Sequence, residues 1–211
     1  VLHEACATIK HWQDTSFPVK RLAVNVSAKQ FRNDCLVSQI QSILAKTQCN
    51  PEFLEIEITE SCLLLPKENK LSTHTSHPSC DHLEDIISIL HKLKKIGIRI
   101  SIDDFGTGYS NLSLLKSISI DCLKIDKSFI ENIFVKNNDE AIVKTIIAMG
   151  MNLNLEIIAE GVEDIQQLRF LIQNQVKIAQ GYYFSQPLPK KQFEEFVKNP
   201  TWDNRSLIQT E

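Results

Sequence analysis

The chain has 211 residues, a formal net charge of −3 and a pI of about 6.1. This length is enough for one large domain with a sizeable core. Apolar residues make up 43% and charged residues 23% of the sequence, as is ordinary for a globular protein. The slightly acidic balance gives no electrostatic signature of duplex nucleic acid binding, which usually needs a basic face, but it is compatible with a small anionic ligand if metal ions supply positive charge.

No apolar run approaches the roughly 20 residues that are needed to cross a bilayer, so no membrane segment is expected in this chain. The first residues, VLHEAC, do not begin with Met and do not form a signal peptide, which predicts a piece of a longer protein. The six cysteines are scattered and form no CxxC motif, so we expect reduced thiols in a cytoplasmic setting.

Strands and helices alternate along the chain. Apolar residues at helical spacing predict helices over 2–12, 34–46, 83–95, 110–117, 139–151, 164–173 and 190–198. Short apolar or alternating runs predict strands at 22–25, 54–57, 98–103, 122–124, 155–160 and 177–180. Such alternation indicates a parallel sheet with crossover helices.

The predicted fold is a TIM-type (β/α)8 barrel. Six βα units can be counted, whereas a closed barrel needs eight, so we expect the first two strands to be missing at the N-terminus. The barrel domain is predicted to cover residues 1–198, followed by a C-terminal tail at 199–211, with an insertion at about 66–82 where the periodic pattern stops. His74, His77, Cys80 and His82 suit Zn²⁺, but their spacing matches no closed zinc site, and a solvated loop is the preferred interpretation.

Polar residues occur at the end of each predicted strand, where a buried strand should avoid them. In a (β/α)8 barrel these ends converge on the face that holds the chemistry. The residues are Asn25, Glu57, Asp103 with Asp104, Lys124, Glu160 and Gln180. Because Asn25 and the four carboxylates offer oxygen ligands, the pattern predicts a site for Mg²⁺ or Mn²⁺.

Adjacent aspartates at one strand end can hold two metal ions, and two such ions form a clamp for in-line displacement at phosphorus. Lys124 is predicted to point into the same interior, where it would orient the attacking water or stabilise developing phosphoryl charge. The loop 104–110 carries two glycines, and Glu60 is predicted to hydrogen-bond Thr107 or backbone N–H groups of this loop.

Structural readings exist for each of these residues taken alone. Asp103 and Asp104 would start a tight turn and cap a helix, Glu57 would pair with Lys124 in an interior bridge, and Asn25 would be a turn residue. Glu160, followed by Gly161, would be a carboxylate at a helix entry, and Gln180 alone indicates little. Their occurrence at six successive strand ends favours the functional reading.

Six segments carry a family resemblance. They are AVNVSA at 23–28, LEIEITE at 54–60, SIDDFGTGYS at 101–110, LKID at 123–126, AEGVE at 159–163 and QGY at 180–182. With these motifs in this order over nearly the whole chain, the sequence resembles the EAL family of cyclic-di-GMP phosphodiesterases of bacteria. The resemblance implies hydrolysis of cyclic-di-GMP to linear pGpG with two Mg²⁺ or Mn²⁺ ions in the complete domain.

The resemblance also implies a role for each matching residue. Asn25, Glu57 and Asp103 would bind the first metal ion. Asp103 and Asp104 would serve the second, with Glu160 in the same cluster, and Lys124 would position the hydrolytic water. Glu60 would hold the 104–110 loop, and Glu163 and Gln180 fall at site positions. A homodimer through this loop and the helix after it is a further implication.

Two departures qualify the resemblance. The Glu-Ala-Leu signature, which would supply one further metal-ligand glutamate, is absent, and so is the arginine that follows it. Both are expected on the missing upstream strands. The chain would then be part of a longer protein, for example the cytosolic part of a sensor. We therefore expect this piece alone to be weak or inactive. One alternative is a catalytically inactive module that binds cyclic-di-GMP or a partner protein. A second alternative is a lyase that uses Lys124 as a Schiff base or one Mg²⁺ for enolate chemistry.

Overall fold

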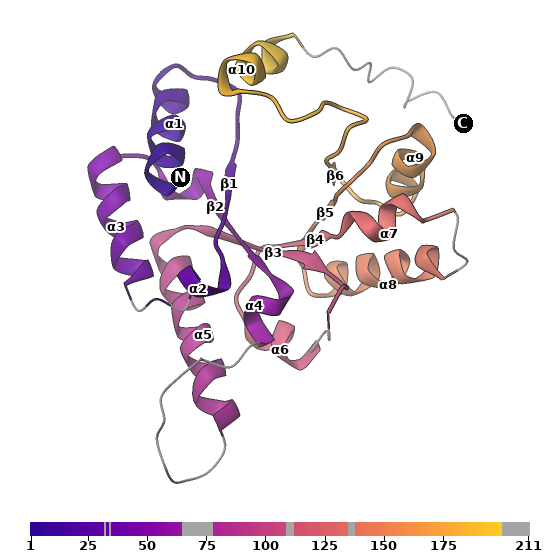
Figure 1. Ribbon diagram of the computed structural model, residues 1–211, viewed down its shortest axis with the longest axis horizontal. Helices are drawn as coiled ribbons and strands as arrows, with labels where there is room; N and C mark the ends of the chain where they lie inside the picture. Colours follow the sequence, from indigo (N-terminus) through magenta and orange to yellow (C-terminus); the bar gives the residue numbers. More distant parts are fainter. Residues whose placement is uncertain (32, 34, 65–77, 109–111, 135–137, 200–211) are drawn as a thin grey trace. The chain divides into compact units, whose positions relative to one another are not determined.

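The computed structural model describes residues 1–31, 33, 35–64, 78–108, 112–134 and 138–199 (Figure 1). The chain divides into two compact units, an N-terminal unit of Val1–Leu123 and a C-terminal unit of Lys124–Glu211. The division falls inside one strand, β4, between Leu123 and Lys124.

The N-terminal unit contains strands that pair in parallel. They are β1 (Leu22–Asn25), β2 (Leu54–Thr59) and β3 (Arg99–Phe105). The register pairs Leu22 with Leu54, and Ile56 with Ile100. The helices of this unit are α1 (Leu2–Asp14), α2 (Ala28–Phe31), α3 (Leu36–Thr47), η1 (Pro51–Phe53), α4 (Glu60–Leu64), α5 (Pro78–Ile96) and α6 (Leu112–Ser117). Helix α3 packs against both α1 and α5 (Figure 1).

Both faces of β2 are buried, as is usual for a parallel sheet between helices and an interior. Leu54, Ile56 and Ile58 are fully buried on one face. Glu55 and Glu57 occupy the other face, because side chains alternate along a strand, and they are 3% and 8% exposed. The interior of this unit is therefore the face that carries charge.

Asp121 connects three parts of the N-terminal unit. Its carboxylate accepts hydrogen bonds from Lys94 Nζ at 2.5 and 2.7 Å and from the Ile100 backbone N–H at 2.9 Å. Its own N–H donates to Ile100 O at 2.9 Å. The end of α5, strand β3 and the entry to β4 (Cys122–Ile125) are thus held together by one side chain.

The C-terminal unit begins with the second half of β4 and contains β5 (Glu156–Ala159) and the two-residue β6 (Ile178–Ala179). Strands β5 and β6 pair in parallel, with Ile158 opposite Ile178. The helices of this unit are α7 (Lys127–Glu131), α8 (Asp139–Asn152), α9 (Ile165–Gln173) and α10 (Lys190–Lys198). The N-terminus of α9 is fixed by residues that are close in sequence, because Asp164 and Gln167 form a reciprocal capping box at its first turn.

The predicted element order agrees with the structure, and the differences lie at the ends. Strands β2 and β3 extend beyond their predicted ends, to Thr59 and Phe105, and β6 is shorter than 177–180. Helix α5 begins at Pro78, inside the predicted 66–82 insertion, whose residues 66–77 lie outside the described part of the chain. Helices α2, α4 and α7 were not predicted, because four or five residues are too few to show a helical period.

Among the residues that the structure describes, no helix is both long and apolar enough to cross a membrane.

Two buried thiols meet in the N-terminal unit, Cys6 of α1 and Cys49 between α3 and η1. Cys6 is 1% exposed and Cys49 is 5% exposed. Burial, followed by the charge and hydrogen bond of Cys49, raises the pKa of the Cys6 thiol from 9.0 to about 12. The folded chain therefore favours the neutral thiol.

This pKa predicts a pH-dependent contribution to stability. In the unfolded chain the Cys6 thiol ionises near its ordinary pKa of 9.0, so its contribution is fully present below that pH and is lost as the pH rises towards about 12. In urea unfolding, the difference in free energy between the natural chain and Cys6→Ala should narrow above pH 9. If the difference in free energy of unfolding stays constant or widens up to pH 11, which is about two pH units above the ordinary pKa of a thiol, the raised pKa of Cys6 is contradicted.

Candidate functional site

Three of the predicted site residues occupy neighbouring strand ends in the N-terminal unit. Asn25 is the last residue of β1 and lies opposite Glu57 of β2 in the parallel register. Thr59, two positions after Glu57, lies opposite Asp103 of β3. The register therefore brings an amide and two carboxylates to the same end of three adjacent strands.

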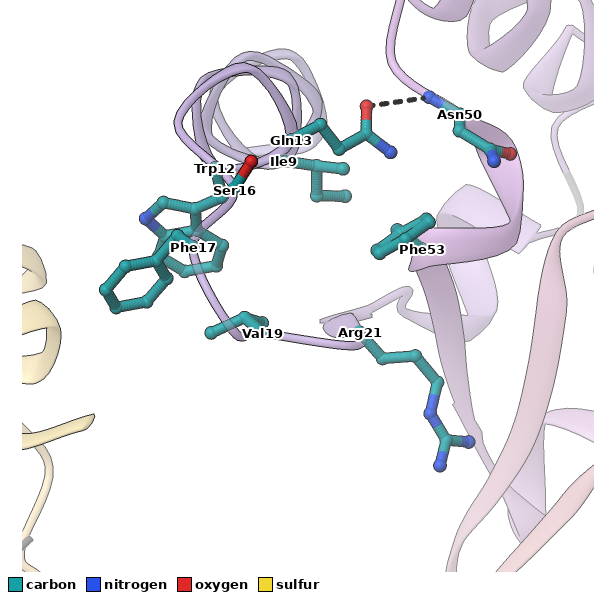
Figure 2. A pocket seen from close by; sticks show the side chains of 9 residues that line it. All are labelled: Ile9, Trp12, Gln13, Ser16, Phe17, Val19, Arg21, Asn50 and Phe53. Carbon is teal, nitrogen blue, oxygen red and sulfur yellow. Dashed lines mark hydrogen bonds between the residues drawn. The ribbon is translucent and has the colours of Figure 1, made fainter. Parts of the chain in front are cut away.

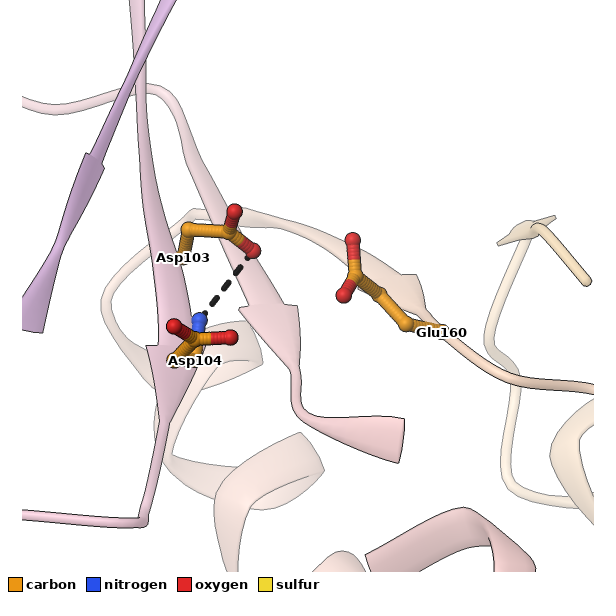
Figure 3. Close-up of side chains that lie close together, drawn as sticks. All are labelled: Asp103, Asp104 and Glu160. Atoms are coloured by element: carbon orange, nitrogen blue, oxygen red, sulfur yellow. Dashed lines mark hydrogen bonds between the residues drawn. The ribbon is translucent and has the colours of Figure 1, made fainter. Parts of the chain in front are cut away.

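Asp103 and Asp104 lie near the carboxyl end of β3, just before the turn that follows this strand (Figure 3). The Asp104 N–H donates to Asp103 Oδ1 at 3.1 Å, and Asp104 itself has a positive φ of 54°. Thr107 Oγ1 donates to Asp104 O at 2.8 Å. Phe105 still belongs to β3 and residues 106–108 are not helical, so these aspartates do not cap a helix as the structural alternative requires. A non-glycine residue in the left-handed region is a strained feature of the kind found at functional sites.

Glu60 holds the loop that follows β3. It is 5% exposed, at the first turn of α4, and its Oε2 accepts the Gly106 N–H at 3.0 Å. A Cβ at Gly108 would lie 3.3 Å from Glu60 Cδ, so the loop approaches this carboxylate closely. The predicted bond from Glu60 to the loop backbone is therefore present, at Gly106.

In the C-terminal unit, Lys124, Glu160 and Gln180 form one polar chain. Lys124 is 3% exposed, and its Nζ lies 2.5 Å from Glu160 Oε1. The same Oε1 accepts a hydrogen bond from Gln180 Nε2 at 2.5 Å. Backbone bonds fix this arrangement, because Glu160 N donates to Ile125 O and Gln180 N donates to Ala159 O. Glu160 follows β5 directly, as Figure 3 shows.

A cavity of about 480 Å³ adjoins this polar chain, and every residue that lines it belongs to the C-terminal unit. Its lining includes the predicted residues Glu160, Glu163 and Gln180. Glu163 is exposed, and its N–H donates to Gln167 Oε1 at 2.7 Å. The cavity falls in the size range of small-ligand pockets.

A second cavity, of about 460 Å³, lies at the other end of the strands in the N-terminal unit (Figure 2). Arg21 and Phe53, which line it, come just before β1 and β2. A hydrogen bond from Asn50 N to Gln13 Oε1, at 3.3 Å, crosses its rim (Figure 2). This cavity is therefore at the opposite ends of these strands from Asn25 and Glu57.

Sequence reasoning missed Glu55. This carboxylate is 3% exposed and lies 3.3 Å from Arg21 Nη1 and 3.6 Å from Arg99 Nε. The signal was in the sequence, because Glu55 shares the interior face of β2 with Glu57. Its two arginine partners identify it as a structural charge in the interior.

Comparison with known proteins decides the family. The profile of the EAL domain matches residues 1–187. The chain is 41% identical over 197 residues to the signaling protein YkoW of Bacillus subtilis, which covers 93% of this chain and 22% of YkoW. It is 36% identical over 203 residues to the cyclic di-GMP phosphodiesterase NbdA of Pseudomonas aeruginosa, which covers 96% of this chain and 24% of NbdA.

The chain belongs to the EAL domain family. It spans about a quarter of the length of these two curated relatives.

Solved EAL structures share its fold. The PaMucR phosphodiesterase in complex with c-di-GMP has a TM-score of 0.79 at 36% identity, over 91% of this chain and 71% of that chain. The EAL domain of Mycobacterium smegmatis DcpA has a TM-score of 0.81 at 30% identity, over 94% and 82%. A manganese and cy-diGMP complex of Klebsiella pneumoniae BlrP1 has a TM-score of 0.69 at 25% identity, over 88% and 44%. The predicted TIM-type fold is thereby confirmed.

The contact of Glu60 with the loop predicts an effect on stability. Glu60→Ala removes the acceptor of the Gly106 N–H, and losing a buried hydrogen bond to a charged group costs about 1.5–3 kcal/mol. Glu60→Gln keeps an oxygen at this position and should cost less. Urea unfolding of the two variants measures the difference, and equal losses would show that the carboxylate does not act through this bond.

The buried ion pair predicts coupling between Lys124 and Glu160. Lys124→Met should lower the free energy of unfolding by about 3–5 kcal/mol, because it leaves a carboxylate without its cation. In a Glu160→Gln background the same change should cost at least about 1 kcal/mol less. Calorimetry on the four proteins of this double-mutant cycle gives the coupling energy, and additive effects would rule out a paired role.

Proposed function

We propose that this chain acts as a phosphodiesterase of weak turnover, which hydrolyses cyclic-di-GMP to linear pGpG. The observation that carries the proposal is that an EAL family member has acidic and amide side chains at the ends of β1, β2 and β3. It also has an ion pair between Lys124 in β4 and Glu160 directly after β5. Its relative NbdA is named a cyclic di-GMP phosphodiesterase, and PaMucR was solved with c-di-GMP bound.

The donor set fits divalent metal ions. Asn25, Glu57 and Asp103 supply oxygen atoms from adjacent strand ends, and Glu57 is only 8% exposed, where a neighbouring cation would offset its burial. We assign these residues to one ion and Asp103 with Asp104 to a second. Glu160 of the C-terminal unit stays a metal ligand predicted from the family resemblance. Divalent metal use is general for EAL structures, as in the manganese complex of BlrP1, and we propose Mg²⁺ or Mn²⁺ here.

The ions, when bound, would neutralise charge on the phosphate oxygens. The residues of the chain do the rest. Lys124 holds its ammonium against Glu160 Oε1, which keeps a positive charge beside the attacking water and the developing phosphoryl charge. The Glu160 carboxylate accepts the water proton as the water oxygen attacks phosphorus in line with the departing ribose oxygen. The ribose oxygen leaves with a proton taken from solvent, Glu160 returns the water proton to solvent, and the product is the linear dinucleotide.

Glu60 and Thr107 have a supporting role in this proposal. Glu60 fixes Gly106, and the Thr107 hydroxyl donates to Asp104 O, so both restrain the turn that presents Asp103 and Asp104. Glu163 and Gln180 line the cavity next to Glu160, where they would contact the substrate. The homodimer through the loop and helix after Asp104 and a bacterial cytoplasmic location remain predictions, and residues 109–111 of that segment lie outside the described part.

A turnover assay tests the proposal. The chain is incubated with cyclic-di-GMP and Mn²⁺, and pGpG is followed by chromatography. Asp103→Asn should lower the rate by about 100-fold or more, because it removes a carboxylate ligand that both proposed metal ions share. Glu140→Gln is the matched control, since this carboxylate only pairs with Lys144 on the surface of α8.

Two outcomes would oppose the proposal. A folded chain that gives no pGpG with Mn²⁺ would overturn the hydrolase activity, and binding of cyclic-di-GMP in Ca²⁺ would then support the inactive binding module instead. An Asp103→Asn variant as active as the Glu140→Gln control would overturn the assignment of the site.

A further inference from the structure

Helix α10 contributes to the cavity beside Glu160. The rings of Phe193 and Phe196 line the same cavity as Glu160 and Gln180. The family match ends at residue 187, so α10 (Lys190–Lys198) lies beyond it. An element outside the matched domain therefore adds aromatic surface to a pocket that begins at a proposed catalytic carboxylate.

The partial exposure of the α10 side chains indicates that the two rings face the cavity and are not enclosed in a packed core. No residue of α10 is fully buried, and Phe193 and Phe196 are half-buried. Their spacing of three residues places both rings on one side of the helix. Tyr182, which is 60% exposed, and Leu188 line the cavity as well, so its wall is rich in flat and apolar groups.

We propose that Phe193 and Phe196 form a stacking wall for one nucleobase of the cyclic dinucleotide, and so set its affinity. This inference rests on the proposed function. A cavity of about 480 Å³ accommodates a base with its sugar, and its continuity with Glu160 and Gln180 connects the base to the phosphate that reacts. Aromatic side chains bind bases of any sequence through their ring faces, and each stacked base contributes about 5- to 100-fold in affinity.

The polar lining favours guanine. Glu131 and Glu163 line the cavity, and carboxylates accept hydrogen bonds only. Guanine offers two adjacent donors, at N1 and N2, whereas the corresponding N1 of adenine is an acceptor. A base that stacks on α10 and turns its donor edge to a carboxylate is therefore the occupant that this lining fits.

Ligand binding to the 211-residue chain tests the role of α10. Phe193→Leu and Phe196→Leu keep an apolar, helix-compatible side chain and remove the ring. Titration calorimetry with cyclic-di-GMP in Ca²⁺ should show Kd raised about 5- to 100-fold. In Mn²⁺ turnover KM should rise with kcat nearly unchanged, because base stacking is made equally in the ground and transition states. Cyclic-di-AMP should bind more weakly than cyclic-di-GMP to the natural chain.

Phe134→Leu is the matched control, since this ring is 54% exposed and is absent from the residues that line the cavity. Phe196→Trp should restore binding and, after subtraction of the natural chain's emission, should show fluorescence quenched by the stacked base. This variant answers the question even if the leucine variants unfold.

The outcomes separate the two proposals. If the natural chain binds cyclic-di-GMP while both leucine variants keep its Kd, or if the tryptophan emission does not change at saturation, the stacking wall is overturned and the proposed function stands. If the natural chain neither binds nor hydrolyses cyclic-di-GMP, both fall together.

Discussion

The structure depends on how charge is held inside a largely apolar sheet. Glu55, Glu57 and Lys124 are 3%, 8% and 3% exposed, and a buried charge without compensation is costly. A different partner compensates the charge at each position. Arg21 and Arg99 surround Glu55, so that charge is neutralised by the chain itself. Lys124 is neutralised by Glu160. Glu57 lies at the strand end next to Asn25, where oxygen donors gather and a cation completes the balance in the proposed site.

The two glutamates of β2 have different roles at different positions along one strand. Glu55 and Glu57 share the interior face but lie two residues apart, so one is nearer the start of the strand and the other nearer its carboxyl end. In folds of this type the carboxyl ends hold the chemistry and the opposite ends hold stability. The arginine pairs at Glu55 and the amide and carboxylates near Glu57 follow that rule.

The proposed stacking of the base draws on a different part of the chain from the proposed chemistry. The groups proposed to react lie in strands or directly after them, where backbone hydrogen bonds fix their positions, as the bonds from Glu160 to Ile125 and from Gln180 to Ala159 show. The aromatic rings of the cavity come from α10, which lies beyond the matched family domain. Strand ends thus suit groups that must be positioned closely, whereas a peripheral helix supplies the proposed stacking surface.

The sequence by itself determined the order of strands and helices, the parallel sheet and the oxygen-donor residues at the strand ends, because apolar period and residue type are local properties. It did not determine that Lys124 pairs with Glu160, that Arg21 and Arg99 neutralise Glu55, or that Phe193 and Phe196 line the cavity beside Gln180. These contacts join residues far apart in the chain. Only the tertiary structure decided them, because strand register and helix docking select partners that no local pattern specifies.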